Sequence, residues 1–255
     1  MRGSLLPRKK GCGVRIMDQN DGIASKVEVL SDGTFNIDGG MLVYGVPKYF
    51  GKLYKARLKP LYIESDDQRI LVDTGVGELP EKWKKIYGVE KETNLISSLE
   101  SMDLSPDDIT MVVNTHLHFD HTGYNRIFSN AVQVAHEDEI RYSAYPDRFQ
   151  KGGYLQDNIK NIKWKGVSGE TEIVPGVTLI PTPGHTPGHM SVLVELEDEV
   201  VVYTGDVSPL SVNHEKRLIV GVLYDPVKAL RSLELMDTIA GWWPDKKKKF
   251  IYSHE

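Results

Sequence analysis

The sequence contains only one cysteine, Cys12. An internal disulfide therefore cannot form, and a metal site built from several thiolates is excluded. No apolar run reaches the roughly 18 residues that a transmembrane helix needs, and no apolar stretch of a secretory signal follows the basic N-terminus. We therefore expect a cytoplasmic protein that does not enter a membrane.

Acidic side chains outnumber basic ones outside the N-terminus. The chain has 31 Lys and Arg against 36 Asp and Glu, a formal net charge of −5, which argues against a dedicated nucleic-acid-binding protein. Residues 1–15 contain five basic side chains and no acidic one, so we interpret residues 1–20 as a basic arm. Residues 21–255 are then long enough to form one domain with a sizeable core.

Strand and helix patterns alternate through this domain. Residues 26–30 and 33–37 flank the turn Ser31-Asp32-Gly33 and are predicted to pair as a hairpin. A second pair of strands, 61–64 and 69–72, flanks Asp66-Asp67. Further strands are expected at 111–113, 131–135, 200–204 and 250–252.

Helical spacing predicts helices at 92–102 and 225–240 and a helix start at 136–142, and Asp225 is in the N-cap position of the 225–240 helix. Two segments lack a clear period. The glycine-rich, aromatic segment 38–60 looks like a loop or small subdomain, and 145–170 looks irregular. Strands in two groups with interspersed helices indicate an α+β fold with two packed sheets covered by helices.

The most informative stretch runs from Thr115 to His121 and reads THLHFDH. Four potential metal ligands, three imidazoles and one carboxylate, lie within six residues at the end of an apolar strand. Borderline divalent metals such as zinc prefer these ligands. In an extended segment His116, His118 and Asp120 would share one face, and a tight turn through Asp120 would bring His121 toward them.

Three further histidines or aspartates follow the same logic. His185 lies in PTPGHTPGH, where two Pro-Gly pairs hold the backbone in tight turns. Asp206 ends the strand VVVYTGD, and His254 ends FIYSHE. Separate strand ends would thus deliver His or Asp to one edge of a sheet sandwich.

Taken together, these motifs resemble the metallo-β-lactamase fold superfamily, from about Thr34 to the C-terminus. The stretches LSDGTFNIDGG, YGVPK and LYIESDDQRILVDTGVG are similar to its branch of quorum-quenching N-acyl homoserine lactonases and methyl parathion hydrolase-like enzymes. The resemblance implies an αββα sandwich with a dinuclear metal site at the edge of the two sheets.

The resemblance also implies roles for the seven residues. One metal would be held by His116, His118 and His185, the other by Asp120, His121 and His254, and Asp206 would bridge the two. Zn²⁺ is the expected metal, with Mn, Fe or Co as alternatives. A metal-bridging hydroxide would open lactones or cleave esters, with promiscuous phosphotriesterase activity, and Asp120 would carry the proton to the leaving group.

One position departs from the lactonase pattern. Many acyl-homoserine lactonases have a tyrosine three residues after the bridging aspartate, where this chain has Pro209. Tyr224, His214 or Tyr44 are the candidate donors in its place, and we name Tyr224 beside Asp120 as a catalytic candidate. Ordinary packing or surface positions are the simpler interpretation of all three.

Several other residues have two interpretations. Asp73, in VDTG, is either an acceptor for a ligand imidazole or part of a plain turn. His189 repeats the context of His185, but seven ligands already fill two sites, so we expect it to support the site or to pack. The aromatic segment Tyr44–Tyr54 would be core or surface in most proteins, and next to a metal site it is equally a candidate substrate lid or homodimer contact.

Rival functions remain on the same fold. A glyoxalase II-like thioester hydrolase has the same ligands but needs a helical domain after the last histidine, and the sequence ends at Glu255. A mononuclear iron sulfur dioxygenase would use His116, His185 and Asp206. Metal content distinguishes the dioxygenase from the hydrolases. A non-catalytic metal-binding protein is the interpretation from a different class, and an ester panel would test it.

Overall fold

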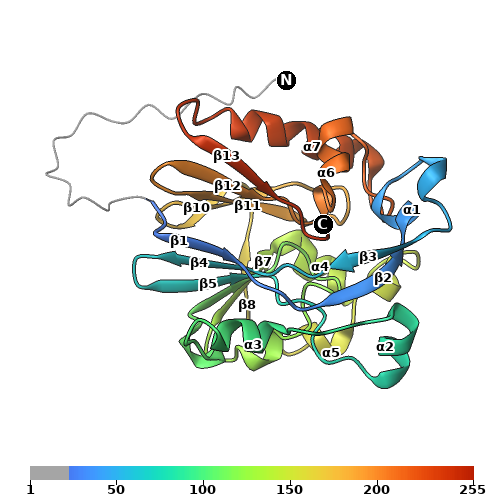
Figure 1. Ribbon diagram of the computed structural model, residues 1–255, viewed down its shortest axis with the longest axis horizontal. Coiled ribbons are helices and arrows are strands. Elements are labelled where there is room, and N and C mark those ends of the chain that lie inside the picture. The colour runs from blue at the N-terminus through green and yellow to red at the C-terminus, as the bar shows by residue number, and fades with distance from the viewer. Residues whose placement is uncertain (1–22) are drawn as a thin grey trace, which may run out of the picture.

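The computed structural model describes residues 23–255, so Cys12 and the basic arm predicted for residues 1–20 lie outside the described residues. Two mixed sheets face each other (Figure 1), with strand orders β1-β4-β5-β6-β7-β8 and β13-β12-β11-β10-β9. The strands of the first sheet are β1 (Lys26–Val29), β4 (Leu61–Ser65), β5 (Gln68–Val72), β6 (Met111–Val113), β7 (Val132–His136) and β8 (Trp164–Val167). Those of the second are β9 (Thr171–Val174), β10 (Val177–Pro181), β11 (Met190–Glu195), β12 (Glu199–Tyr203) and β13 (Lys247–Ile251).

The remaining elements surround this sandwich. Strands β2 (Thr34–Asp38) and β3 (Leu53–Arg57) form a separate two-stranded ribbon beyond one edge of the sheets (Figure 1). The α-helices are α1 (Gly39–Leu42), α2 (Glu81–Tyr87), α3 (Leu95–Glu100), α4 (Glu137–Ala144), α5 (Gln156–Ile159), α6 (Ser211–Lys216) and α7 (Pro226–Ala240). None of the helices in residues 23–255 is both long and apolar enough to cross a bilayer.

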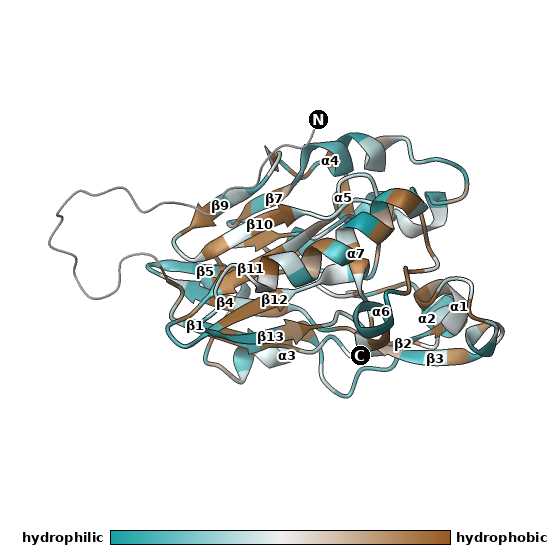
Figure 2. Ribbon diagram, turned by 90° about the horizontal axis from the view of Figure 1, so that it is seen from above, coloured by the Kyte–Doolittle hydropathy of each residue, from teal (hydrophilic) through white to brown (hydrophobic). Residues whose placement is uncertain are grey.

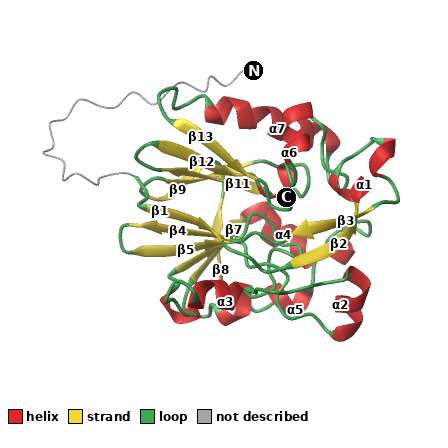
Figure 3. Cartoon of the chain, in the orientation of Figure 1, coloured by secondary structure: helices red, strands yellow, loops and turns green. Residues whose placement is uncertain are grey.

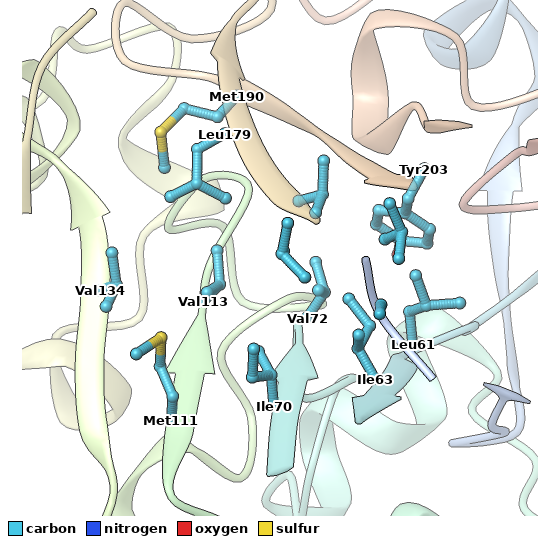
Figure 4. Close-up of a cluster of buried hydrophobic side chains, with 14 of the residues drawn as sticks. Leu61, Ile63, Ile70, Val72, Met111, Val113, Val134, Leu179, Met190 and Tyr203 are labelled. Carbon is cyan, nitrogen blue, oxygen red and sulfur yellow. The ribbon is translucent and has the colours of Figure 1, made fainter. Parts of the chain in front are cut away.

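The core lies between the two sheets, because successive side chains of a strand point to opposite faces. In β4, Leu61 and Ile63 face the second sheet, whereas Tyr62 faces outward. In β12, Val201 and Tyr203 face the first sheet. Figure 4 shows side chains of the first sheet, such as Ile70 and Met111, facing side chains of the second sheet, such as Leu179 and Met190.

Helices cover both outer faces (Figure 3). Helix α3 packs Leu95 and Leu99 against the outer face of the first sheet, and α7 packs Leu233 and Met236 against that of the second. Figure 2 shows α7 crossing the second sheet with mixed polar and apolar residues along its length. The predicted αββα sandwich is therefore confirmed, and Asp225 caps α7 as expected, accepting hydrogen bonds from the backbone N–H groups of Val227 and Lys228.

The predicted hairpin between residues 26–30 and 33–37 is wrong. Both strands exist, but β1 pairs with β4 and β2 pairs with β3. The buried carboxylate of Asp32 explains this, because it accepts hydrogen bonds from the backbone N–H groups of Val76, Gly77 and Leu95. These partners lie far along the chain, so residues 31–33 cross between two sheets instead of making a local turn.

The two segments without a clear period contain more structure than expected. Segment 38–60 includes α1 and the strand β3, and it contacts the 219–222 loop through hydrogen bonds such as Tyr44 N–H to Ile219 O at 2.9 Å. Segment 145–170, predicted to be irregular, contains α5 and the edge strand β8. Short elements of this kind bury few residues and leave little periodicity.

Candidate metal centre

Strand ends assemble the site at one edge of the sandwich. Strands β5, β6 and β7 are parallel, and they end at Val72, Val113 and His136. Asp73 and the THLHFDH loop directly follow two of them. In the second sheet β12 and β13 are parallel and precede Asp206 and His254. Parallel strands end at the same edge, so chain segments far apart in the sequence meet there.

The THLHFDH loop makes the tight turn that the sequence suggests. The N–H of His121 donates to the carbonyl of His118 at 3.1 Å, which reverses the chain around Asp120. His116, His118, Asp120 and His121 are all buried. The structure also brings His185, Asp206 and His254 to this loop, so all seven predicted ligand residues lie together.

Three imidazole nitrogens form the first group. His116 Nε2 lies 3.1 Å from His118 Nδ1, and His185 Nε2 lies 3.1 Å and 3.0 Å from these two atoms. Burial lowers the pKa of all three histidines, so the imidazoles are neutral near pH 7. Three neutral nitrogens directed at one point are a ligand set suited to a divalent cation.

Hydrogen bonds on the far side of the rings assign the lone pairs. His185 Nδ1 donates to the carbonyl of Val222 at 2.7 Å, and His254 Nδ1 donates to that of Arg57 at 2.9 Å. With the proton on Nδ1, the lone pair of each ring lies on Nε2 and faces the centre. His121 Nε2 is likewise buried and has no hydrogen-bond partner among residues 23–255. A buried ring nitrogen without a hydrogen-bond partner fits a position next to a metal ion.

The second group combines carboxylates with imidazoles. Asp120 Oδ2 lies 3.7 Å from His121 Nε2 and 3.5 Å from His254 Nε2. Asp206 stands between the groups: its Oδ1 faces His121 and His254 at 3.4 Å and 3.3 Å, and its Oδ2 faces His185 at 3.5 Å. The two groups, and Asp206 between them, are the sets that the resemblance assigns to two metals. That assignment remains a prediction.

In this second group, neighbouring charges and burial shift the pKa values of His121 and Asp206 in opposite directions. Burial by itself would lower the pKa of His121, but the carboxylates of Asp73, Asp206 and Asp120 raise it well above its usual range. Burial would raise the pKa of Asp206, but His254 and His121 hold it well below its usual range. The group thus holds buried negative charge that positive charge must balance.

Asp73 supports one histidine of each group. Its Oδ2 accepts from His121 Nδ1 at 2.8 Å, and both carboxylate oxygens lie within 3.1 Å of the Thr115 hydroxyl. Thr115 Oγ1 in turn lies 3.1 Å from His116 Nδ1 and can accept a hydrogen bond from it. Of the two interpretations of Asp73, the geometry therefore favours the acceptor that orients ligand imidazoles.

His189 contacts the backbone of the proposed ligand Asp206. Its Nε2 accepts from the backbone N–H of Asp206 at 2.8 Å, and its Nδ1 lies 2.8 Å from the hydroxyl of Thr182. Burial lowers the pKa of His189 to about 3, so the ring is neutral. Gly205 adopts φ +56°, and a Cβ there would come within 2.6 Å of this ring. His189 therefore orients Asp206, a supporting role in line with the sequence interpretation.

Glu139 is a supporting residue that the sequence analysis missed. This fully buried carboxylate accepts from the N–H of Leu117 at 3.0 Å, the N–H of Gly188 at 3.1 Å and the hydroxyl of Tyr154 at 2.9 Å. It thereby joins the loop of His116 and His118 to the loop of His185. An acidic residue in the first turn of a helix is common, so the sequence carries no signal for this role.

The three candidate donors differ in position. Tyr224 adjoins His185: its N–H bonds to the carbonyls of Gly184 and His185, and its ring lies 5.2 Å from that of Tyr142. His214 is engaged elsewhere, between Asp237 and Tyr252. Tyr44 is 55% exposed. A catalytic role for Tyr224 remains a prediction.

A sandwich of two sheets with histidines and aspartates at one edge defines a class of metal-dependent hydrolases, and this protein is one of them. The sequence profile of the metallo-beta-lactamase superfamily matches residues 61–239. The chain belongs to this superfamily, which confirms the resemblance drawn from its motifs.

Individual relatives are more specific. The N-acyl homoserine lactonase AiiA of Bacillus thuringiensis subsp. kurstaki is 28% identical over 214 residues, which cover 79% of this chain and 82% of the relative. A solved N-acyl homoserine lactone hydrolase, with the product N-hexanoyl-L-homoserine at its catalytic metal centre, superimposes with a TM-score of 0.77 at 26% identity. The superposition covers 91% of this chain and 94% of the solved chain. The solved structure of a probable metal-dependent hydrolase from Staphylococcus aureus superimposes with a TM-score of 0.81 at 26% identity. This superposition covers 92% of this chain and 90% of the solved chain.

Proposed function

We propose that this protein hydrolyses lactones, with N-acyl homoserine lactones as the substrate class, through a dinuclear zinc centre. The observation that carries the proposal is the position of Asp206, whose two carboxylate oxygens face the two groups of nitrogens separately. A carboxylate that reaches two ligand sets is suited to bridging two cations about 3.5–4 Å apart. The lactonase relatives support the choice of substrate.

His116, His118 and His185 would hold one ion, and Asp120, His121 and His254 the other. When bound, two such ions supply a Lewis acid for the carbonyl oxygen and make a water more acidic. The other steps belong to side chains of the chain itself. Asp73, His189 and Glu139 orient the ligands, and the hydrogen bonds from Nδ1 of His185 and His254 to backbone carbonyls keep Nε2 of each ring directed inward.

Asp120 is the proton carrier in this proposal. Its Oδ2 faces His121 and His254, while no hydrogen bond from residues 23–255 reaches its Oδ1. Asp206, by contrast, accepts a hydrogen bond from Ser253 at 2.7 Å. Asp120 therefore takes the proton of the attacking water as the C–OH bond forms. It returns the proton to the ring oxygen as the lactone C–O bond breaks.

The test is turnover by the zinc-loaded full-length protein on N-acyl homoserine lactones, with alkyl esters, aryl esters, phosphotriesters and glutathione thioesters as comparison substrates. We expect lactones to be hydrolysed with broad acyl tolerance and aryl esters and phosphotriesters more slowly. Asp120→Asn should keep the fold and lose most hydrolysis. Thioester turnover without lactone turnover, or one bound iron with oxygen consumption, would reverse the proposal in favour of the glyoxalase II-like or dioxygenase alternative.

A further inference from the structure

Helix α2 holds Tyr87 in a defined place against Phe119, the residue between the proposed ligands His118 and Asp120. The helix ends at Gly88, which has φ +53°, and a Cβ at Gly88 would come within 2.3 Å of the side-chain nitrogen of Asn36 in β2. The end of α2 therefore lies directly on the ribbon of β2 and β3. Tyr87, the last helical residue, cannot move away without separating these elements.

Aromatic contacts connect Tyr87 to the ligands. Its ring stacks on that of Phe119 with centroids 4.8 Å apart, and it meets the edge of Phe35 at 6.5 Å. Phe119 lies between His118 and Asp120 in the chain. The ring of Phe35 lies 5.5 Å from that of His254. Tyr87 therefore lies on the side of the centre formed by Asp120 and His254.

The hydroxyl of Tyr87 has no hydrogen-bond partner among residues 23–255, and the side chain is only partly buried, so the hydroxyl is free to bind a substrate. Five other tyrosines donate their hydroxyls to carboxylates: Tyr62, Tyr124, Tyr142, Tyr154 and Tyr203. Burial, and then the negative charge of Asp120, raise the pKa of Tyr87, so its hydroxyl keeps its proton and remains a donor.

From this placement we propose that Tyr87 is a catalytic residue: its hydroxyl donates a hydrogen bond to the leaving oxygen of the substrate, beside Asp120. The inference rests on the proposed hydrolysis. As the C–O bond breaks, the leaving oxygen gains negative charge, and a fixed donor stabilises it without giving up its own proton. Asp120 then delivers the proton that it took from water. Pro209 has no side-chain donor that could do this.

The experiment compares leaving groups in the zinc-loaded wild type and Tyr87→Phe, a substitution that keeps the ring contacts. A lactone releases a strongly basic alkoxide, whereas a p-nitrophenyl ester releases a weakly basic phenolate. We expect Tyr87→Phe to lower kcat on the lactone by about 10²-fold, the usual effect of losing one such donor. KM, zinc content and kcat on the p-nitrophenyl ester should change by less than about threefold.

Two matched variants serve as controls. Tyr145→Phe removes a hydroxyl that is 92% exposed and should leave every parameter unchanged. Tyr224→Phe tests the donor on the opposite side, beside His185. The inference is overturned if Tyr87→Phe keeps lactone kcat within about twofold, if it slows both substrates equally, or if Tyr224→Phe alone shows the leaving-group effect.

The substrates that the wild type hydrolyses show whether the proposed function or the role of Tyr87 has failed. If it hydrolyses alkyl esters but no lactone, the lactonase proposal fails, and the comparison of alkyl with p-nitrophenyl esters still tests Tyr87. If it hydrolyses neither lactones nor esters after zinc loading, the proposed hydrolysis fails and the role of Tyr87 fails with it.

Discussion

The carboxylate of Asp73 lies 2.8 Å from Nδ1 of His121, across 48 positions of the sequence. Asp73 follows β5 and has φ +60°, a backbone conformation that aspartate and asparagine tolerate better than most residues. Through Thr115 the same carboxylate also reaches His116. One buried acid thus fixes the orientation of an imidazole in each of the two ligand groups.

We therefore expect Asp73→Asn to weaken metal binding by about 10–100-fold and to lower activity to a similar degree, because the amide cannot accept all of these donors. Titration of apo protein with zinc, followed by a competing chelator, measures the affinity. Asp66→Asn is the matched control, since Asp66 also has a positive φ, +49°, but lies in an exposed turn. Equal zinc affinity in the Asp73 variant and the wild type would contradict the role of Asp73.

His185 and His189 occur in the same Pro-Gly-His context but should behave differently. His185→Ala removes a proposed ligand and should leave about one equivalent of zinc. His189→Ala should keep both ions but destabilise the protein by about 1–3 kcal/mol, because the N–H of Asp206 and the hydroxyl of Thr182 lose their partner. Elemental analysis and thermal unfolding of both variants check this. If only the His189 variant lost a metal, His189 would be the ligand and His185 the supporting residue.

Glu139→Gln should destabilise the fold by about 1–3 kcal/mol and also weaken zinc binding. The amide keeps the size of the side chain, but one of its two ends no longer accepts a hydrogen bond from Leu117 or Gly188. Glu137→Gln, two residues earlier, removes only a surface ion pair with Arg141 and should change stability by less than about 1 kcal/mol. Unfolding in denaturant with and without zinc measures both effects, and identical results for the two variants would remove Glu139 from the site.

Removal of the metal should lower the melting temperature. A site that is filled at a free zinc concentration 100-fold above its Kd stabilises the native state by about 2.7 kcal/mol. Chelation of the wild type should therefore lower the melting temperature by several degrees, and added zinc should restore it. In His254→Ala, which lacks one ligand of the second group, chelation should lower the melting temperature by less than in the wild type, because one of the two ions is already bound weakly. A wild-type melting temperature that is independent of chelator would argue against a zinc centre in this protein.

Much of the site could be predicted because its signals are local. Four ligand residues lie within six positions, and His185, Asp206 and His254 each stand at a strand end or a Pro-Gly turn. Short apolar runs such as 61–64 and 200–204 also indicate strands, because a strand that is covered on both faces is apolar along its length. The long helix α7 carries its own cap in Asp225 and was predicted within a residue of its observed bounds.

Other features depend on contacts between distant segments. The pairing of β1 with β4 follows from the position of Asp32, whose partners include Lys91 at 2.8 Å. Glu139 looks like an ordinary helix residue until the fold places it between two ligand loops. The stacking of Tyr87 on Phe119 depends on where α2 lies on β2. The spacing of residues in the sequence does not predict these contacts.

By itself, the sequence determined which chemical groups are present, at which strand ends they stand, and which superfamily they resemble. The tertiary structure alone decided which carboxylate orients which imidazole, that Asp206 faces both groups, and which tyrosine stacks on Phe119. The physical reason is that ligand type and local turns depend on neighbouring residues. Hydrogen bonds and ring contacts across the site depend instead on two sheets packing through a core whose contacts span the whole domain.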